Sequence, residues 1–322
     1  MPFKQALDDA VRAADPSVWR GGGEVMREMA GSCFDVGDHL ALGADGQTLV
    51  GHGADGRKEV LSVYDIVGGT VTRLLRGHQG SIQSVAVQGD LIMSGDGTGA
   101  ILLWSLSSGA NTGQLMSAGG RAHKREVFGL AVEGDLLVSG SHDNTIKLWS
   151  LASKENTATL RASGGVNSVA LTGDGAVVSG GQDRVAKVWL LSGGATEPTH
   201  TWQHPGKVYS VAAAGDVVAT GCMDGGVRTF SRAMNARTRE FTEHRSWCNT
   251  VRLLGPLLVS GSTDATVKVW SLATPQGELI TSLDAHTHMV LGLAVSHTNG
   301  CIASLGQDGK VFVWKPSAPP AA

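Results

Sequence analysis

Hydrophobic and polar residues alternate in short runs along most of this chain. Residues 145–151 read TIKLWSL and residues 266–272 read TVKVWSL, so that every second side chain is apolar. A period of two is typical of a β-strand with one buried face. Pairs such as Gly89-Asp90 and Gly134-Asp135 separate these runs, and glycine and aspartate together favour tight turns. The pattern therefore predicts an all-β protein built from short antiparallel strands.

The alternating runs belong to a longer repeat. The clearest copy, LLVSGSHDNTIKLWS at residues 136–150, has counterparts at 91–105, 176–190, 217–231, 257–271 and 301–315. A degenerate first copy occupies residues 48–65. Each copy closes on an aromatic residue, and these aromatics follow one another at intervals of 40 to 45 residues: Tyr64, Trp104, Trp149, Trp189, Phe230, Trp270 and Trp314.

Each period has room for about four short strands. One four-stranded sheet cannot bury both of its faces, but seven sheets packed radially can, and each then leaves only short, protected edges. The sequence thus predicts a seven-bladed β-propeller of four-stranded antiparallel blades.

The repeat resembles that of the WD-repeat family over residues 24–315. In that family a His, a Ser or Thr, an Asp and a Trp of one repeat form a hydrogen-bonded tetrad. The resemblance implies complete tetrads in the third, sixth and seventh copies. Their members are His123, Ser139, Asp143 and Trp149; His244, Ser260, Asp264 and Trp270; and His286, Ser304, Asp308 and Trp314.

The other four copies depart from this pattern. The second keeps His78, Ser94 and Trp104, but Thr98 stands where the Asp is expected. The fourth has Ala162 in place of the His. The fifth keeps its His, Thr and Asp but has Phe in place of Trp: His204, Thr220, Asp224 and Phe230. The first keeps only Asp55, with Cys33 and Gly51 in the positions of the His and the Ser.

The resemblance also implies that the first strand of each repeat is the outer strand of the preceding blade. The last blade then needs a strand from the N-terminus, and residues 24–29 (EVMREM) are the natural candidate. Pairing of the two chain ends would close the ring and remove an unpaired edge. We expect residues 1–23 to form a short amphipathic helix, stopped at Asp15-Pro16, and a flexible glycine-rich connector. We expect residues 316–322 to be a disordered tail.

Composition narrows the functional class. The net charge is −3, which offers no overall basic field for nucleic acid, and no apolar run is long enough to cross a membrane. The four cysteines are far apart, as expected of reduced thiols in an intracellular protein. These features favour a location in the cytoplasm, or in both cytoplasm and nucleus, and a monomer that works within a larger complex.

The many histidines do not indicate catalysis or metal binding. Five of the 11 fall in the tetrad position, where a neutral imidazole is a structural partner. His286 and His288 could be two zinc ligands, but no third ligand has compatible spacing. No nucleophile elbow or phosphate-binding loop occurs. We therefore expect a protein that is not an enzyme and that holds no metal or other cofactor.

Function is then expected on the surface. WD-repeat proteins commonly bind partners on the narrow top face around the central channel, so the resemblance implies that positions at the start of each innermost strand are exposed there. Large apolar residues occupy several of these positions and are candidates for binding other proteins or peptide segments: Phe128, Tyr209, Met223, Trp247, Met289 and Leu291. Burial under local loops is the alternative. A basic fringe that includes Lys124, Arg125, Lys207 and Arg245 would suit an acidic partner segment, or it is a solvated rim.

Two functions fit these expectations. The first is a non-catalytic scaffold or adaptor. The second is substrate recognition in a ubiquitin ligase, because the repeat style is similar to that of F-box-linked propellers. However, the first blade strand begins at residue 24, which leaves too little preceding chain for an F-box. The positions where relatives that read phosphodegrons carry Arg hold Gln, Met and Thr, and no copy ends in Trp-Asp-x-Arg.

Overall fold

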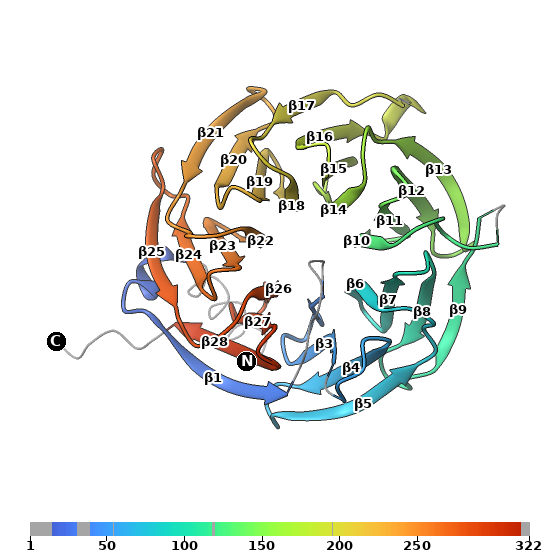
Figure 1. Cartoon of the computed structure of the whole chain (residues 1–322), viewed down its shortest axis with the longest axis horizontal. Helices are drawn as coiled ribbons and strands as arrows, with labels where there is room; N and C mark the ends of the chain where they lie inside the picture. The colour runs from blue at the N-terminus through green and yellow to red at the C-terminus, as the bar shows by residue number, and fades with distance from the viewer. Residues whose placement is uncertain (1–14, 31–38, 54, 118–119, 195, 317–322) are drawn as a thin grey trace, which may run out of the picture.

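The computed structural model describes residues 15–30, 39–53, 55–117, 120–194 and 196–316. These residues form a closed ring of seven four-stranded antiparallel sheets around a central channel (Figure 1). The predicted all-β fold and blade count are confirmed. The helix expected before residue 15 and the tail after residue 316 lie outside the described residues. None of the helices described is long and apolar enough to span a membrane.

The first four blades use consecutive strands, ordered from the channel outward. Blade 1 contains β2 (Ala41–Leu42), β3 (Thr48–His52), β4 (Val60–Asp65) and β5 (Thr70–Arg76). Blade 2 contains β6 (Ile82–Gln88), β7 (Leu91–Asp96), β8 (Ile101–Ser105) and β9 (Asn111–Leu115). Blade 3 contains β10 (Val127–Glu133), β11 (Leu136–Ser141), β12 (Thr145–Ser150) and β13 (Glu155–Arg161). Blade 4 contains β14 (Val166–Leu171), β15 (Ala176–Gly181), β16 (Val185–Leu190) and β17 (His200–Gln203).

The last three blades follow the same plan until the chain ends meet. Blade 5 contains β18 (Val208–Ala214), β19 (Val217–Cys222), β20 (Val227–Ser231) and β21 (Ala236–Phe241). Blade 6 contains β22 (Cys248–Leu254), β23 (Leu257–Ser262), β24 (Val267–Ser271) and β25 (Glu278–Leu283). Blade 7 contains β26 (Val290–Val295), β27 (Ile302–Gly306), β28 (Lys310–Pro316) and, outermost, β1 (Gly23–Ala30). The predicted closure by an N-terminal strand is therefore confirmed.

The turns between the first two strands of a blade need glycine. Gly89, Gly134 and Gly215 have φ of 57°, 59° and 55°, a left-handed conformation that side chains with a Cβ rarely adopt. The aspartate that follows each glycine then accepts hydrogen bonds from the third strand of the blade: Asp135 accepts from Ser150 Oγ at 2.7 Å and from the amide of Ala152. In blades 2, 3 and 5 the Gly-Asp pair thus ties the turn between the first two strands to the third strand.

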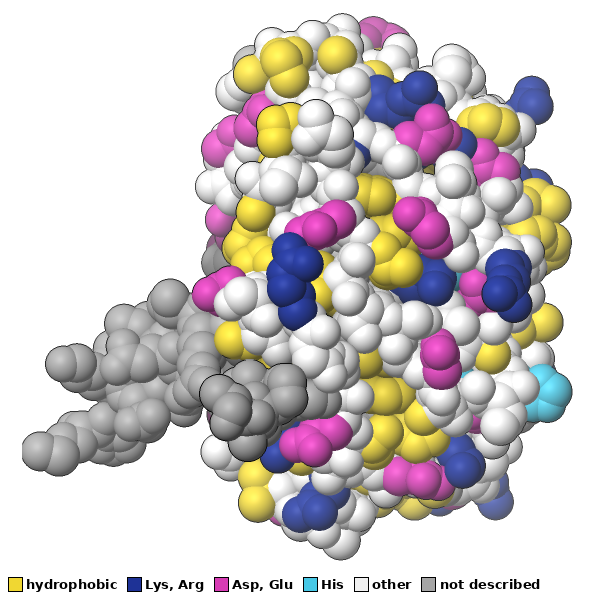
Figure 2. All heavy atoms as spheres, turned by 90° about the vertical axis from the view of Figure 1, so that its left-hand side faces the viewer, with side chains coloured by type: hydrophobic (Ala, Val, Ile, Leu, Met, Phe, Trp, Pro, Cys, Tyr) yellow, Lys and Arg dark blue, Asp and Glu magenta, His cyan; other side chains and the backbone are white. Residues whose placement is uncertain are grey.

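The hydrophobic core lies between neighbouring blades. Trp149 of blade 3 is fully buried and packs with Met93 and Leu103 of blade 2. Trp189 of blade 4 packs in the same way against Val138 and Leu148 of blade 3. On the side of the ring that carries β25, hydrophobic, basic and acidic side chains are intermixed (Figure 2). The apolar positions of the alternating strands therefore pack between neighbouring blades.

The segment that directly precedes β1 packs against the blades that close the ring. Asp15 caps a short helix, because its carboxylate accepts from Ser17 N at 2.8 Å and Pro16–Trp19 form the 3-10 helix η1. Trp19 is fully buried against blades 6 and 7. A Cβ on Gly23 would lie 2.5 Å from Leu283 and 2.9 Å from Trp19, so glycine permits close packing here rather than flexibility.

Candidate functional site

Each predicted tetrad is assembled from the loop before the innermost strand, the second and third strands of the blade and the turn between those two strands. In blade 3, Ser139 Oγ accepts a hydrogen bond from Trp149 Nε1 at 2.8 Å and lies 2.7 Å from His123 Nε2. His123 Nδ1 lies 3.0 Å from Asp143 Oδ2. The serine has one proton and gives it to Nε2, so Nδ1 carries the imidazole proton and donates to the carboxylate. Blades 6 and 7 repeat this geometry with the residues expected: His244, Ser260, Asp264 and Trp270, then His286, Ser304, Asp308 and Trp314.

Burial and hydrogen bonding fix the protonation states of this network. Burial lowers the pKa of His123, although the hydrogen bond to Asp143 opposes that effect, so the ring is neutral. For Asp143, burial by itself would raise the pKa. Hydrogen bonds from His123, Thr145 and the Lys124 amide more than offset it and hold the pKa far below its ordinary value. The tetrad is a buried structural network and exposes no reactive group.

Blade 2 also has a complete tetrad, contrary to the sequence prediction. Asp96, at the end of β7, lies 2.9 Å from His78 Nδ1, and Ser94 Oγ lies 2.6 Å from His78 Nε2. Thr98, assigned to the position of the acid, donates to Asp96 at 2.7 Å instead. The spacing of the other copies hid this acid, because the chain supplies it two residues earlier.

Blade 4 replaces the missing histidine with a lysine. Lys187 Nζ lies 2.5 Å from Asp183 Oδ2 and also donates to Ser163, beside the position of Ala162. Trp189 still donates to Ser179 at 2.8 Å. Lys187, from the third strand, thus pairs with the turn carboxylate of Asp183, whereas a histidine pairs with the corresponding carboxylate in blades 3, 6 and 7.

In blade 5 the expected partners separate. His204 Nε2 lies 3.0 Å from Thr220 Oγ1, but its Nδ1 lies 3.0 Å from the Trp202 carbonyl. Asp224 pairs with Arg228 instead, at 2.6 Å. Phe230, which has no indole donor, stacks on Trp202 with ring centroids 4.6 Å apart.

In blade 1, Asp55 pairs with Arg76 at 2.8 Å rather than with a histidine. Cys33 lies outside the described residues. Within the described part of the chain, no group of three or more His, Cys, Asp or Glu side chains could hold a metal ion.

The end of the ring at which each innermost strand begins is called the top face below. Tyr209 of β18 and Trp247, which precedes β22, meet there with ring centroids 5.7 Å apart. Trp247 is 40% exposed and Met289 is 36% exposed, while Tyr209 and Met223 are half-buried. Two aromatic rings from neighbouring blades therefore form one apolar surface that is open to solvent.

Two of the candidate residues differ from these. Phe128 is half-buried and stacks on His142, with centroids 4.1 Å apart, and His142 Nε2 lies 2.9 Å from Asn167 Oδ1. Leu291 is only 2% exposed and packs with Leu40 and Leu305 in the core. The expectation that Leu291 is exposed was wrong, because the short strand β2 of blade 1 lies against β26 and covers it.

Asparagines at the same level have a structural role. Asn167 Nδ2 donates to the Val208 carbonyl at 2.8 Å, and Asn249 Nδ2 donates to the Val290 carbonyl at 2.9 Å. Each bond joins one innermost strand to the next blade. These amides hold the ring together at the channel mouth and are buried.

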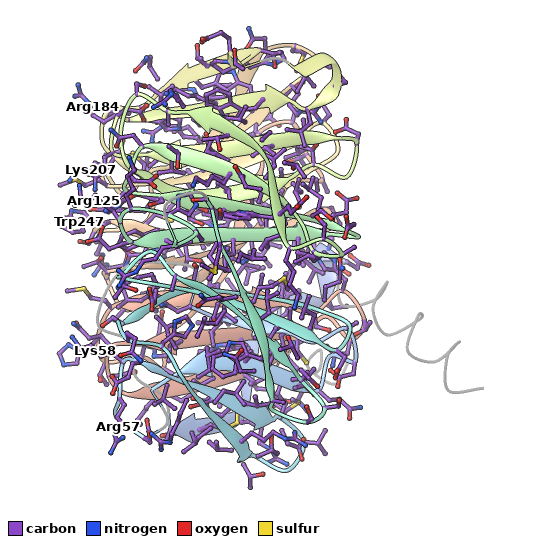
Figure 3. The ribbon with its side chains drawn as sticks, turned by 90° about the vertical axis from the view of Figure 1, so that its right-hand side faces the viewer. Arg57, Lys58, Arg125, Arg184, Lys207 and Trp247 are labelled. Carbon is purple, nitrogen blue, oxygen red and sulfur yellow. The ribbon has the colours of Figure 1, made fainter. Side chains whose placement is uncertain are left out.

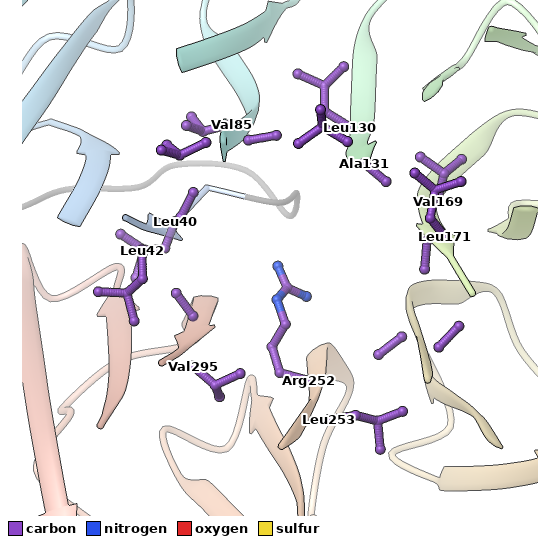
Figure 4. A pocket seen from close by; sticks show the side chains of 18 of the residues that line it. Leu40, Leu42, Val85, Leu130, Ala131, Val169, Leu171, Arg252, Leu253 and Val295 are labelled. Atoms are coloured by element: carbon purple, nitrogen blue, oxygen red, sulfur yellow. The ribbon is translucent and has the colours of Figure 1, made fainter. Parts of the chain in front are cut away.

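The central channel has an apolar wall with one charged residue at its middle level. Small side chains occupy this level in six blades: Ala41, Ala86, Ala131, Ala170, Ala212 and Ala294. In blade 6 the same register position holds Arg252, opposite Val259. Figure 4 shows its guanidinium extending from the wall into the channel, in a cavity of about 400 Å³. The alanines thus leave the space that the arginine enters.

Comparisons with known proteins agree with this architecture. The family model described as WD domain, G-beta repeat matches residues 115–150, 154–189, 196–231, 235–271 and 277–315, more than half of the chain. Periodic tryptophan protein 2 homolog of Dictyostelium discoideum is 30% identical over 158 residues, 46% of this chain and 17% of that protein. Actin-interacting protein 1 of Drosophila melanogaster is 29% identical over 155 residues, 46% of this chain and 25% of that protein.

Two further matches complete the comparison. Small ribosomal subunit protein RACK1y of Oryza sativa subsp. japonica is 39% identical over 75 residues, 22% of each chain. The chain thus spans a quarter or less of these curated relatives. A chain in a structure titled Crystal Structure of Mitotic Checkpoint Complex superposes with a TM-score of 0.80 over 90% of this chain and 91% of that one, at 20% identity, which shows a shared fold.

Proposed function

The chain belongs to the WD40 repeat family, and from this premise we propose that it is a scaffold or adaptor that binds a segment of another protein on its top face. Homologous WD40 propellers are generally non-catalytic scaffolds. Actin-interacting protein 1 is named for an interaction with another protein, and the structural neighbour comes from a protein complex.

The exposed pair of Tyr209 and Trp247 is the observation that carries this proposal. A tryptophan that is 40% exposed leaves apolar surface in water, which is unfavourable unless the surface serves a contact. Trp and Tyr are the residues that most often dominate the binding energy of an interface. Met223 and Met289 flank the pair on the same face and add adaptable apolar surface.

A pull-down with quantitative mass spectrometry tests the proposal. Trp247→Ala is expected to weaken partner binding by about thirtyfold or more, since truncating a central aromatic anchor costs roughly 2 kcal/mol or more. The melting temperature should change little, because the side chain is partly in solvent. Lys154→Ala is the control, since Lys154 lies on the turn between β12 and β13 at the opposite end of the blade.

The two variants separate binding from folding. Loss of partners with Trp247→Ala alone, at an unchanged melting temperature, supports the top face as the binding site. Retention of all partners, or unfolding of the Trp247→Ala protein, contradicts the proposal, because Trp247 then belongs to the packing.

A further inference from the structure

The top face carries basic side chains although the whole chain is slightly acidic. Figure 3 shows Arg57, Lys58, Arg125, Arg184, Lys207 and Trp247 at the same edge of the ring. Lys124 and Arg245 lie on loops that lead into innermost strands, so they belong to this face as well. The opposite end carries the turn carboxylates of Asp90, Asp135, Asp174 and Asp216. Cations lie at that end as well: Arg232 pairs with Asp174 at 2.9 Å, and Lys154 donates to the Thr112 carbonyl.

Several top-face cations are without a carboxylate partner among the residues that the structure describes. They are exposed or half-buried: Arg57 in blade 1, Lys124 in the loop before blade 3, Arg184 in blade 4, and Lys207 and Arg245 in the loops before blades 5 and 6. By contrast, Lys187 and Arg228, lower in their blades, are paired with Asp183 and Asp224. The cations available for a ligand are thus the outermost ones.

Most carboxylates of this face are already used. The side chains of Asp143, Asp264 and Asp308 are 6%, 8% and 3% exposed, and each accepts a hydrogen bond from a tetrad histidine. Glu126 at the channel mouth lies 3.4 Å from Arg125. The exposed carboxylates of Glu59, Glu243 and Asp284 belong to loops. Asp284 directly follows the outer strand β25, and Glu243 lies two residues after the outer strand β21. A ligand near the channel mouth therefore meets cations first.

The basic side chains surround the aromatic pair. Lys207 precedes Tyr209 by two residues on the same chain segment, and Arg245 stands in the same relation to Trp247. Lys207 and Arg125 also come close to His142 from two different blades: burial is the main cause of the lowered pKa of His142, and the charges of Arg125 and Lys207 lower it further. Cations and apolar rings thus share one surface across blades 3 to 6.

We propose that this surface binds an acidic peptide segment, with an apolar side chain of the segment packed on Tyr209 and Trp247 and its Asp or Glu residues paired with Lys207, Arg245, Arg184 and Lys124. The inference rests on the proposed function and specifies the partner. Phosphate groups are usually held by several clustered arginines. Here single cations come from separate blades, a spacing that suits carboxylates distributed along a peptide.

Each cation contributes modestly because it is exposed and screened by salt. Several cations together favour a negatively charged partner and speed its association. The apolar pair supplies the contact that salt does not weaken. Binding of the acidic segment therefore combines a salt-dependent part with a part that depends on Trp247.

Titration of the full chain with synthetic peptides tests the proposal, read by fluorescence anisotropy at low and at physiological ionic strength. The probe is a short labelled peptide in which Asp and Glu flank one leucine. Its matched control has Asn and Gln in place of the acids. A third probe, oligothymidylate, has a nucleic-acid backbone that is negatively charged like the acidic peptide. The variants are Lys207→Glu with Arg245→Glu, and a control of equal charge change away from this face, Arg73→Glu with Lys154→Glu.

We expect the acidic peptide to bind at least about tenfold more tightly than the amide peptide, and more weakly as salt rises. Lys207→Glu with Arg245→Glu should abolish this difference, while the control pair keeps it. Equal binding of the acidic and amide peptides, both lost with Trp247→Ala, would overturn the acidic specificity and leave the top-face function intact. Tighter binding of oligothymidylate through the same two cations would assign the surface to nucleic acid and overturn the inference. Failure of the acidic peptide to bind would overturn it too.

Discussion

His78 and Asp96 form a buried pair with 2.9 Å between Nδ1 and Oδ2, and this pair completes a tetrad in a repeat that lacks an Asp at the usual position. Burial by itself would raise the pKa of Asp96. Hydrogen bonds from His78, Thr98 and the Ala100 amide lower it to about 2. The carboxylate therefore stays ionised, and the network of blade 2 matches those of blades 3, 6 and 7.

Asp96→Ala should consequently destabilise the protein as much as Asp143→Ala does. Either change leaves a buried imidazole N–H without its acceptor, which costs on the order of 1–3 kcal/mol of the free energy of unfolding. Urea unfolding measures the change, with the exposed Asp284→Ala as the control. An unfolding midpoint for Asp96→Ala that equals that of the control would mean that Asp96 does not complete the tetrad.

In blade 4 the prediction concerns the cation of a buried ion pair rather than its carboxylate. Lys187 and Asp183 have side chains only 10% and 13% exposed, so removing the cation leaves a largely buried carboxylate unpaired. Lys187→Ala should lower the free energy of unfolding by about 2–4 kcal/mol. Ala162→His alone should bring no gain in stability to the wild-type protein, because Lys187 and Ser163 already bind the Asp183 carboxylate. A clear gain in melting temperature from Ala162→His alone would contradict this arrangement.

The closing segment predicts a graded response to truncation. Removing residues 1–14 leaves Trp19 and β1 in place and should preserve the melting temperature. Removing residues 1–33 exposes the edge of β28 over the register from Pro316 to Lys310, and should lower stability and promote aggregation. Light scattering on heating compares the two forms. Trp19→Ala should cost about 3–5 kcal/mol, because the side chain is fully buried.

Acid should destabilise the protein through His204. Burial lowers its pKa to about 4, below the ordinary 6.5, while the bond to the Trp202 carbonyl partly opposes this. Between these two pH values the unfolded chain binds a proton that the folded chain does not, so stability is present above pH 6.5 and is lost as the pH falls toward 4.

The measurement is the free energy of unfolding against pH in that window. His204→Gln should make the wild-type slope shallower by up to about 1.4 kcal/mol per pH unit, the value for one proton. Parallel curves for the two proteins would show that His204 is not the group responsible.

The fold could be predicted from local sequence because each repeat contains its own strand and turn signals. Alternation of period two places Ile146 and Leu148 on one side of β12, and Gly134-Asp135 makes the turn between β10 and β11. The aromatic period of 40 to 45 residues sets the blade count. The three tetrads with regular spacing were readable for the same reason: their members lie at fixed positions in a repeated strand pattern.

Other features depended on contacts between residues far apart in the chain. Local spacing assigned Thr98, whereas packing placed Asp96 against His78. Leu291 matches the half-buried Tyr209 in register, but β2 covers it because blade 1 follows blade 7 in the closed ring. Trp19 and Gly23 pack on Leu283 only after the ends of the ring meet. The sequence by itself determined the strands, the turns and the number of blades, since these follow from residues within one repeat. The tertiary structure alone decided which surface positions remain open and which polar groups find partners, since neighbouring blades and ring closure supply those contacts.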